Sequence, residues 1–111
     1  MKPAQLNISL YKGGSWKKRL TFRVNGTPIS LVNQTFKAQI RPAYNSNILS
    51  AEIGVTVDQT ETGVLYLELT ANQTAELSGT LVWDLKSTDN ETDEVNYWVN
   101  GSVSIGGRVT I

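Results

Sequence analysis

Residues 49–69 have the sequence LSAEIGVTVDQTETGVLYLEL, and this stretch decides the fold that the sequence predicts. Apolar and polar residues alternate from Leu49 to Val57, and the alternation resumes at Leu65, Leu67 and Leu69. A period of two is typical of β-strands that bury one face. The polar run 58–63 between them ends in glycine, which is typical of a turn. We therefore expect two consecutive strands joined by a turn.

The same alternation continues outward on both sides of this stretch. It recurs near residues 6–10, 16–24, 36–40, 81–85 and 95–105. Seven to eight short strands at this spacing predict an all-β fold, an immunoglobulin-like antiparallel β-sandwich, with a small barrel as the alternative. A chain of 111 residues without repeat or linker predicts a single domain over 1–111. One short helical turn is expected near 70–77, where Thr70 and Gln73 form a capping-box pattern.

Two residues interrupt the strand pattern. Lys18 has the parity of the apolar residues Trp16 and Leu20, so the second strand is predicted to start after Lys18 or to contain a bulge there. Gly101 lies in the middle of the last strand and predicts a bulge or a bend. Both residues mark places where the strand register is expected to change.

The chain contains no cysteine and no histidine. Disulfides and thiolate metal sites are therefore excluded, and the commonest general base is missing. Only Ser–Lys pairs or paired carboxylates remain for catalysis, as in a carboxylate-based hydrolase or lyase. Glu52, Glu68 and Asp84 each stand at an outward position, where a solvated charge is the ordinary occupant. We therefore expect a protein that is not an enzyme, with no catalytic residue and no cofactor.

The first residues, Met1 to Gln5, contain no apolar segment of the signal-peptide type. No run in the chain approaches the roughly 18 apolar residues of a membrane-spanning helix. We expect synthesis in the cytoplasm without export, and no contact with a membrane.

The charges are distributed unevenly along the chain. Residues 1–50 carry eight Lys and Arg and no acid, whereas residues 51–111 carry ten acids and two basic residues, which gives +8 and −8. One interpretation is that the two halves neutralise each other across neighbouring strands. The other is that copies of the chain pack positive face to negative face.

Lys17, Arg19 and Arg23 form a basic stripe on one predicted strand face. The stripe lacks the interleaved aromatic residues of a nucleic-acid platform, and the isoelectric point of about 6.2 is low for a DNA-binding domain. The stripe therefore predicts an edge strand that faces solvent or a protein partner, and no nucleic acid.

The run Asp89 to Glu94 concentrates oxygen ligands of the kind that calcium prefers. It lacks the glycine and the distant glutamate of an EF-hand loop, and acidic hairpin tips are ordinary. We predict a solvated hairpin over 87–94 and no metal site.

The aromatic residues divide into core and surface candidates. Trp16 and Trp83 lie on apolar strand faces and are predicted to be in the core. Trp98 shares its parity with polar neighbours, so it is a candidate partner-contact residue, as is Tyr44 in the loop after Pro42. The alternative for Trp98 is a change of parity caused by a bulge near Gly101.

Four segments, in this order along the chain, carry a resemblance: YKGGSW at 11–16, TFKAQIR at 35–41, LELTANQTAEL at 67–77 and VWDL at 82–85. The chain resembles a family of small tailed-bacteriophage virion proteins and is similar to the N-terminal domain of phage upper-baseplate proteins. The resemblance extends from Leu6 to Thr110. The chain departs from the family at Gly14, where many relatives have an acidic residue, and in a longer hairpin at 87–94.

The resemblance implies an immunoglobulin-like domain that assembles in several copies into a virion. The expected role is a tail or baseplate adaptor that binds other virion proteins, with a capsid decoration (cement) protein as the alternative. A short tail, Arg108 to Ile111, follows Gly106-Gly107 and is expected to add a strand to a neighbour. The alternative from another class is a carbohydrate-binding module for host-surface attachment, with Trp98 and Tyr44 as stacking platforms.

Overall fold

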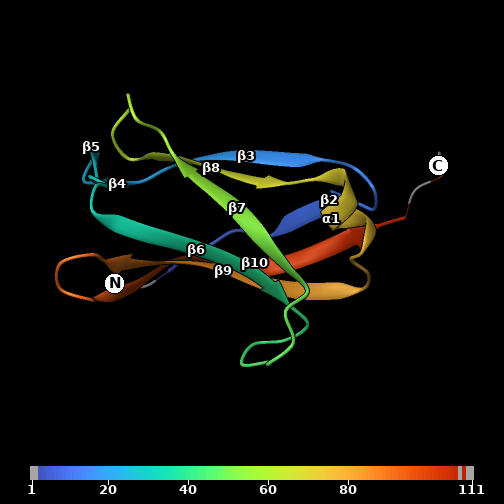
Figure 1. The fold of residues 1–111 in the computed structure, drawn as a ribbon. Coiled ribbons are helices and arrows are strands. Elements are labelled where there is room, and N and C mark those ends of the chain that lie inside the picture. The colour runs from blue at the N-terminus through green and yellow to red at the C-terminus, as the bar shows by residue number, and fades with distance from the viewer. Residues whose placement is uncertain (1–2, 108, 110–111) are drawn as a thin grey trace.

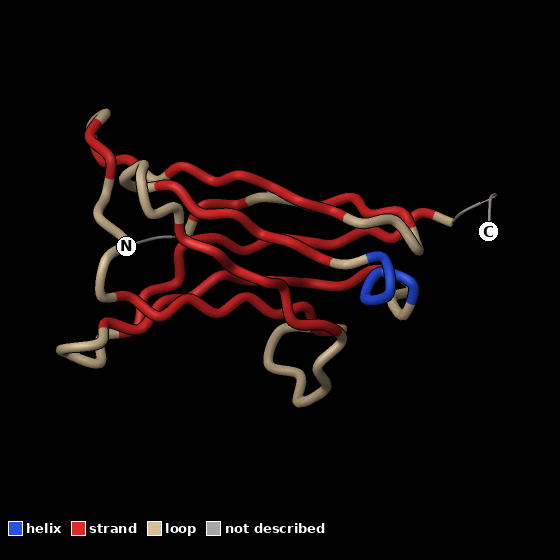
Figure 2. Tube along the Cα trace, turned by 45° about the horizontal axis from the view of Figure 1, so that its top comes forward, coloured by secondary structure: helices blue, strands red, loops and turns tan. Residues whose placement is uncertain are grey.

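A computed structural model describes residues 3–107 and 109 of the chain. The elements are β1 (Ala4–Gln5), β2 (Ile8–Tyr11), β3 (Trp16–Thr21), β4 (Arg23–Val24), β5 (Thr27–Pro28), β6 (Gln34–Arg41), β7 (Ala51–Val57), β8 (Val64–Leu69), α1 (Ala71–Ala75), β9 (Thr80–Asp89) and β10 (Val95–Gly106). Figure 2 shows the strands filling the molecule and the single short helix at one end. The prediction of an all-β fold with one helical turn is confirmed.

Eight strands form one curled sheet in the order β1-β10-β9-β6-β7-β8-β3, with β2 also paired to β10, and β4 and β5 form a separate hairpin. The curl passes through β7, because residues 51–53 pair with β6 and residues 54–57 pair with β8. As a result β3 and β8 lie over β6, β9 and β10 (Figure 1). The immunoglobulin-like arrangement stays a prediction.

The core lies between the two parts of the curled sheet. Trp83 is only 1% exposed and Trp16 packs against the core, so both predictions are confirmed. The other fully buried hydrophobic side chains are aliphatic and come from both parts of the sheet and from the segment after α1: Ile40, Leu65, Leu67, Leu69, Leu77, Leu85, Val64 and Val103. Burying a side chain of this size contributes about 1.5–3 kcal/mol. These inward faces fix which residues of each strand remain outside.

The helical turn is capped as the sequence predicts. The Thr70 Oγ1 accepts a hydrogen bond from Gln73 N (3.2 Å), and the Gln73 Oε1 accepts one from Thr70 N (2.9 Å). The Gln73 Nε2 also donates to the Glu52 carbonyl oxygen at 2.8 Å. The capping box therefore ends β8 and ties α1 to β7.

Gly101 does not cause the bulge that is one of its two predicted effects, so that part of the prediction is wrong. Gly101 pairs in register with Trp83, but a Cβ atom at this position would overlap the carbonyl oxygen of Leu6. The same carbonyl accepts a hydrogen bond from Trp83 Nε1 at 2.8 Å. Glycine is needed here because the segment between β1 and β2 passes directly over the strand.

Lys18 also leaves the register intact, so the predicted strand start or bulge is wrong. β3 pairs with β8 without a shift from Trp16 to Thr21, and Lys18 stands opposite Leu67. Lys18 therefore has the same parity as the inward residues Trp16 and Leu20, but its side chain stays exposed because β3 is an edge strand. A charge in this position discourages a further strand from pairing with the edge.

Candidate functional site

The predicted basic stripe does not form one cationic surface. The Lys17 Nζ lies 3.6 Å from the Glu68 carboxylate, and Arg19 forms an ion pair with Glu61, which raises the pKa of Arg19. Arg23 stands apart in the β4–β5 hairpin and is exposed. Both ion pairs join the basic half of the chain to the acidic half. They agree with the interpretation that the two halves neutralise each other across strands.

Trp98 is not an exposed contact residue, and this prediction is wrong. Its ring packs 5.1 Å from that of Phe22 and 6.3 Å from that of Phe36, measured between centroids. Its Nε1 donates a hydrogen bond to the Oγ of Ser87 at 2.8 Å. The pairing of β10 with β9 shifts between Tyr97 and Val99, which turns Trp98 inward. The alternative interpretation is correct, although the shift lies before Gly101.

Tyr97 is the outward aromatic residue that sequence reasoning missed. It is 46% exposed and stands opposite Lys86 of β9. Strict alternation along the strand predicts an inward position for Tyr97, because it shares the parity of Val95 and Val99. The signal that identifies the shift is the run of three apolar residues Tyr97, Trp98 and Val99, which cannot all lie on one face of a regular strand.

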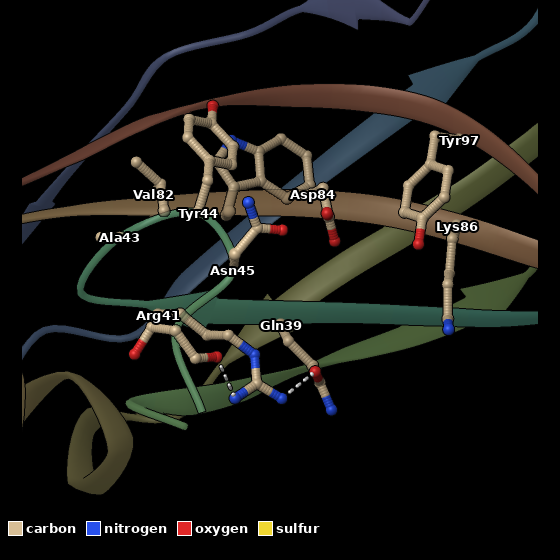
Figure 3. A pocket seen from close by; sticks show the side chains of 11 residues that line it. Gln39, Arg41, Ala43, Tyr44, Asn45, Val82, Asp84, Lys86 and Tyr97 are labelled. Carbon is tan, nitrogen blue, oxygen red and sulfur yellow. Dashed lines mark hydrogen bonds between the residues drawn. The ribbon is translucent and has the colours of Figure 1, made fainter. Parts of the chain in front are cut away.

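A shallow hollow of about 180 Å³ lies on the outer face of β6, β9 and β10. Tyr44 and Tyr97 lie at its two ends with Asp84 between them (Figure 3). The remaining polar side chains at the hollow come from the same strands and the following loop: Gln39, Arg41, Asn45, Ser46 and Lys86. The structure thus brings the predicted contact residue Tyr44 together with Tyr97, and leaves Lys17, Arg19 and Arg23 elsewhere.

The loop 42–50 carries Tyr44 and is held over this face by Arg41. The guanidinium donates to the Ser46 carbonyl oxygen at 3.2 Å and to the Gln39 Oε1 at 2.8 Å. Asn45 adopts a positive φ of 64°, which asparagine tolerates better than most residues. The Ser50 N donates to the Ile40 carbonyl oxygen at 2.8 Å and closes the loop. These contacts fix the place of Tyr44 relative to the strands.

Asp84 is half-buried at the centre of the hollow. Burial raises the pKa of its carboxyl group, and the nearby Lys86 and Arg41 oppose this rise. Within residues 3–107 no donor makes a hydrogen bond to the carboxylate. A partly desolvated carboxylate without donors is an acceptor for a ligand that brings its own.

The outer face also carries two cations that face each other across neighbouring strands. Lys37 of β6 stands directly opposite Lys86 of β9. Like charges in this position repel each other and destabilise the pair of strands. The two ion pairs of the described chain, Lys17–Glu68 and Arg19–Glu61, involve neither lysine. An anion bound beside them would remove the repulsion.

The acidic hairpin satisfies its first carboxylate internally. β9 extends to Asp89, whose Oδ1 accepts hydrogen bonds from Glu91 N (2.8 Å) and Thr92 N (3.1 Å), and these bonds lower the pKa of Asp89. Ser87 is fully buried and does not belong to the solvated hairpin that the sequence predicts. No group of three or more acids able to hold a metal ion is found in the part of the chain that is described.

The loop 42–50 also presents apolar side chains to solvent. Tyr44 is 56% exposed, Ile48 66% and Leu49 46%. Side chains of this size on one loop form a candidate surface for a protein partner.

The predicted strand-adding tail falls on Arg108, Thr110 and Ile111, which lie outside the described residues, and on Val109. None of the helices described is long and apolar enough to span a membrane. A scan against protein-family models finds no match to the chain, and a search of the curated proteins finds none either.

Proposed function

We propose that this chain is a non-enzymatic structural protein of a tailed-bacteriophage virion, an adaptor in the tail or baseplate that assembles in several copies and binds neighbouring virion proteins. The resemblance of segments 11–16, 35–41, 67–77 and 82–85 supports the family. The proposal includes an immunoglobulin-like domain, in which β3 and β8 face β6, β9 and β10. It also includes a location in the virion after synthesis in the cytoplasm of a bacterial host.

The observation that carries the proposal is the exposure of Ile48 and Leu49 on the loop 42–50. A large aliphatic side chain gains about 1.5–3 kcal/mol when it is moved from water into an apolar contact. Two adjacent side chains of this kind on a loop fixed by Arg41 gain this energy against a partner protein. A rigid loop loses little conformational entropy when it binds, which favours a structural contact.

Mass spectrometry of gradient-purified virions, from the culture that carries the gene, tests the proposal. We expect the chain in the particles at a constant ratio to the major virion proteins. Its presence in separated tails would identify an adaptor, and its presence in separated heads would identify the capsid decoration protein that is our second candidate. Absence of the chain from purified particles would overturn both.

A matched pair of variants tests the contact surface. We expect Ile48→Ser with Leu49→Ser to fold normally and to be lost from the particles. The control is Val24→Ser with Val32→Ser, which removes two other exposed aliphatic side chains. Incorporation of both double variants would show that the loop does not hold the partner.

The carbohydrate-binding alternative that uses Trp98 and Tyr44 as stacking platforms fails at Trp98. Trp98 cannot act as a stacking platform, because its indole packs between Phe22, Phe36 and Ser87. Tyr44 alone does not make such a platform.

A further inference from the structure

We propose that the hollow between Tyr44 and Tyr97 binds an anionic saccharide, a single hydroxylated ring that carries a carboxylate or a phosphate. This inference rests on the hollow and not on the proposed location in a virion. It therefore holds or fails separately from the function proposed above.

The two tyrosines supply the surfaces for a sugar ring. They come from different elements, the loop 42–50 and β10, and lie at the two ends of the hollow (Figure 3). A tyrosine offers an apolar ring face and a hydroxyl group together, which suits a ligand with C–H groups on its faces and hydroxyl groups at its rim. Both rings are about half exposed and need no rearrangement to be reached.

Asp84 and Asn45 supply the polar recognition. The Asp84 carboxylate has no donor within the described residues, although burial raises its pKa. Two neighbouring sugar hydroxyl groups would donate to its two oxygens. The amide of Asn45 lies between Tyr44 and Asp84 and both donates and accepts (Figure 3). Such a set recognises a polyhydroxylated ligand.

Lys86 and Lys37 select a negative charge on the ligand. They stand opposite each other on β9 and β6, and Lys86 is also opposite Tyr97. A carboxylate or phosphate placed at this end of the ring would bind Lys86 and cancel the repulsion between the two lysines. A neutral sugar would leave that repulsion in place.

Size and strand pairing favour a sugar ring over a peptide. The hollow of about 180 Å³ is smaller than the roughly 300–1,000 Å³ of pockets that enclose drug-sized ligands, so it suits one ring. Along the hollow, β9 pairs with β6 on one side and with β10 on the other, and β6 pairs with β9 and, at Gln39, with β7. Their backbone groups are therefore not free to pair with an added peptide strand.

An NMR titration of the ¹⁵N-labelled protein tests the proposal. The probes are glucuronic acid and galacturonic acid, glucose 6-phosphate, the neutral sugars glucose and galactose, and acetate as a carboxylate without a ring. We expect saturable shifts of backbone amides in 39–46, 82–86 and 96–98 with an acidic probe. Affinity for the matching neutral sugar should be at least about tenfold lower, because a charge-assisted hydrogen bond is lost.

The uronic acids and the sugar phosphate distinguish the source of the negative charge, and a response to either supports the proposal. Three results would overturn it. These are no saturable shift with any acidic probe, equal shifts with acetate, and shifts located away from the hollow.

Variants of the outer face make the test specific. We expect Tyr97→Ala, Asp84→Asn and Lys86→Gln each to weaken binding at least about tenfold while the dispersion of the spectrum is kept. Tyr11→Ala and Lys12→Gln should bind as the unmodified chain does, because β2 pairs with residues 103–106 of β10 and not with the part that carries Tyr97. Unchanged binding in Asp84→Asn and Lys86→Gln would overturn the assignment, whatever Tyr97→Ala does to folding.

Discussion

The two outer faces of the curled sheet treat charge in opposite ways. On the face of β3 and β8, Lys17 lies beside Glu68 and 6.0 Å above the ring of Tyr66, and Arg19 pairs with Glu61. On the face of β6, β9 and β10, a lysine stands opposite a lysine, and no donor in the described part of the chain bonds to Asp84. The basic residues Lys17 and Arg19 of the first face are paired within one chain. Between residues 3 and 107, the charges of the second face are not paired in this way.

This difference separates a structural surface from a binding surface. Paired charges on an exposed sheet each contribute only a few tenths of a kcal/mol, but they leave nothing for a ligand to supply. An unpaired and partly desolvated charge lowers stability, and such groups are concentrated at binding and catalytic sites. The outer face of β6, β9 and β10 is therefore where we place recognition.

The largest expected loss of stability comes from replacing Trp98, which packs beneath the face of β6, β9 and β10. Trp98→Ala should lower the free energy of unfolding by about 2–4 kcal/mol, because it deletes a partly buried indole and leaves the buried Ser87 without its donor. Denaturation in urea, followed by circular dichroism, measures this loss. Tyr97→Ala, at the adjacent residue, should cost less than about 1 kcal/mol. Equal losses would contradict the assignment of inward and outward faces.

Acid should change the contributions of Asp58 and Asp84 to the free energy of unfolding in opposite directions. Hydrogen bonds from Glu61 N, Thr60 N and the Thr60 hydroxyl lower the pKa of Asp58 from 3.8 to about 2. Its folded-state pKa lies below the unfolded value, so its contribution to stability is present above pH 3.8 and is lost as the pH falls towards 2. The pKa of Asp84 is raised above 3.8, so its unfavourable ionisation in the folded state is relieved as the pH falls through its folded-state pKa towards 3.8.

Urea denaturation between neutral pH and pH 2 measures both contributions. Asp58→Asn should reduce the loss of stability in acid, because it removes the carboxylate whose protonation causes that loss. Asp58 belongs to the loop that also supplies Glu61. Asp84→Asn should raise stability at neutral pH and remove the gain in stability that protonation of Asp84 gives as the pH falls towards 3.8. A lower stability of Asp84→Asn at pH 7 would show that Asp84 has a structural partner.

The smallest expected effect distinguishes Lys37, which faces Lys86 across strands, from Lys17, which faces Glu68. Lys37→Gln should stabilise the chain by about 0.2–1 kcal/mol because it ends the repulsion with Lys86. Lys17→Gln should destabilise it by a similar amount because it removes the pair with Glu68. Both differences should shrink when the measurement is repeated in 1 M salt, where exposed charges are screened. The same sign for both variants would remove the contrast between the faces.

Much of the fold could be predicted from the sequence. The alternation in 49–69 identified β7 and β8, and the pattern at Thr70 and Gln73 identified the cap of α1. The role of Gly101 could not be predicted, because it depends on Leu6, which lies next to it only in the folded sheet. Lys18 was misread because alternation does not show that an edge strand tolerates a charge with inward parity.

The site was harder to predict than the fold. A shift of one residue at Tyr97–Val99 exchanges inward and outward side chains, so Trp98 was chosen in place of its neighbour. Tyr44 was identified because it stands in a loop. That the loop lines one hollow with Asp84 and Lys86 depends on the pairing of three strands that are far apart in the sequence.

The parallel pairing of the first strands with the last one determines how the molecule bears a pulling force. Ala4 pairs with Val99 and Tyr11 with Gly106, so tension applied before Ala4 and after Gly106 draws β10 and its partners in opposite directions along their length. The hydrogen bonds between them are then loaded in shear and share the force, instead of breaking one after another. We expect high rupture forces in single-molecule pulling between these points. A chain fixed at both ends in a contracting or impact-loaded particle would gain mechanical strength from this geometry.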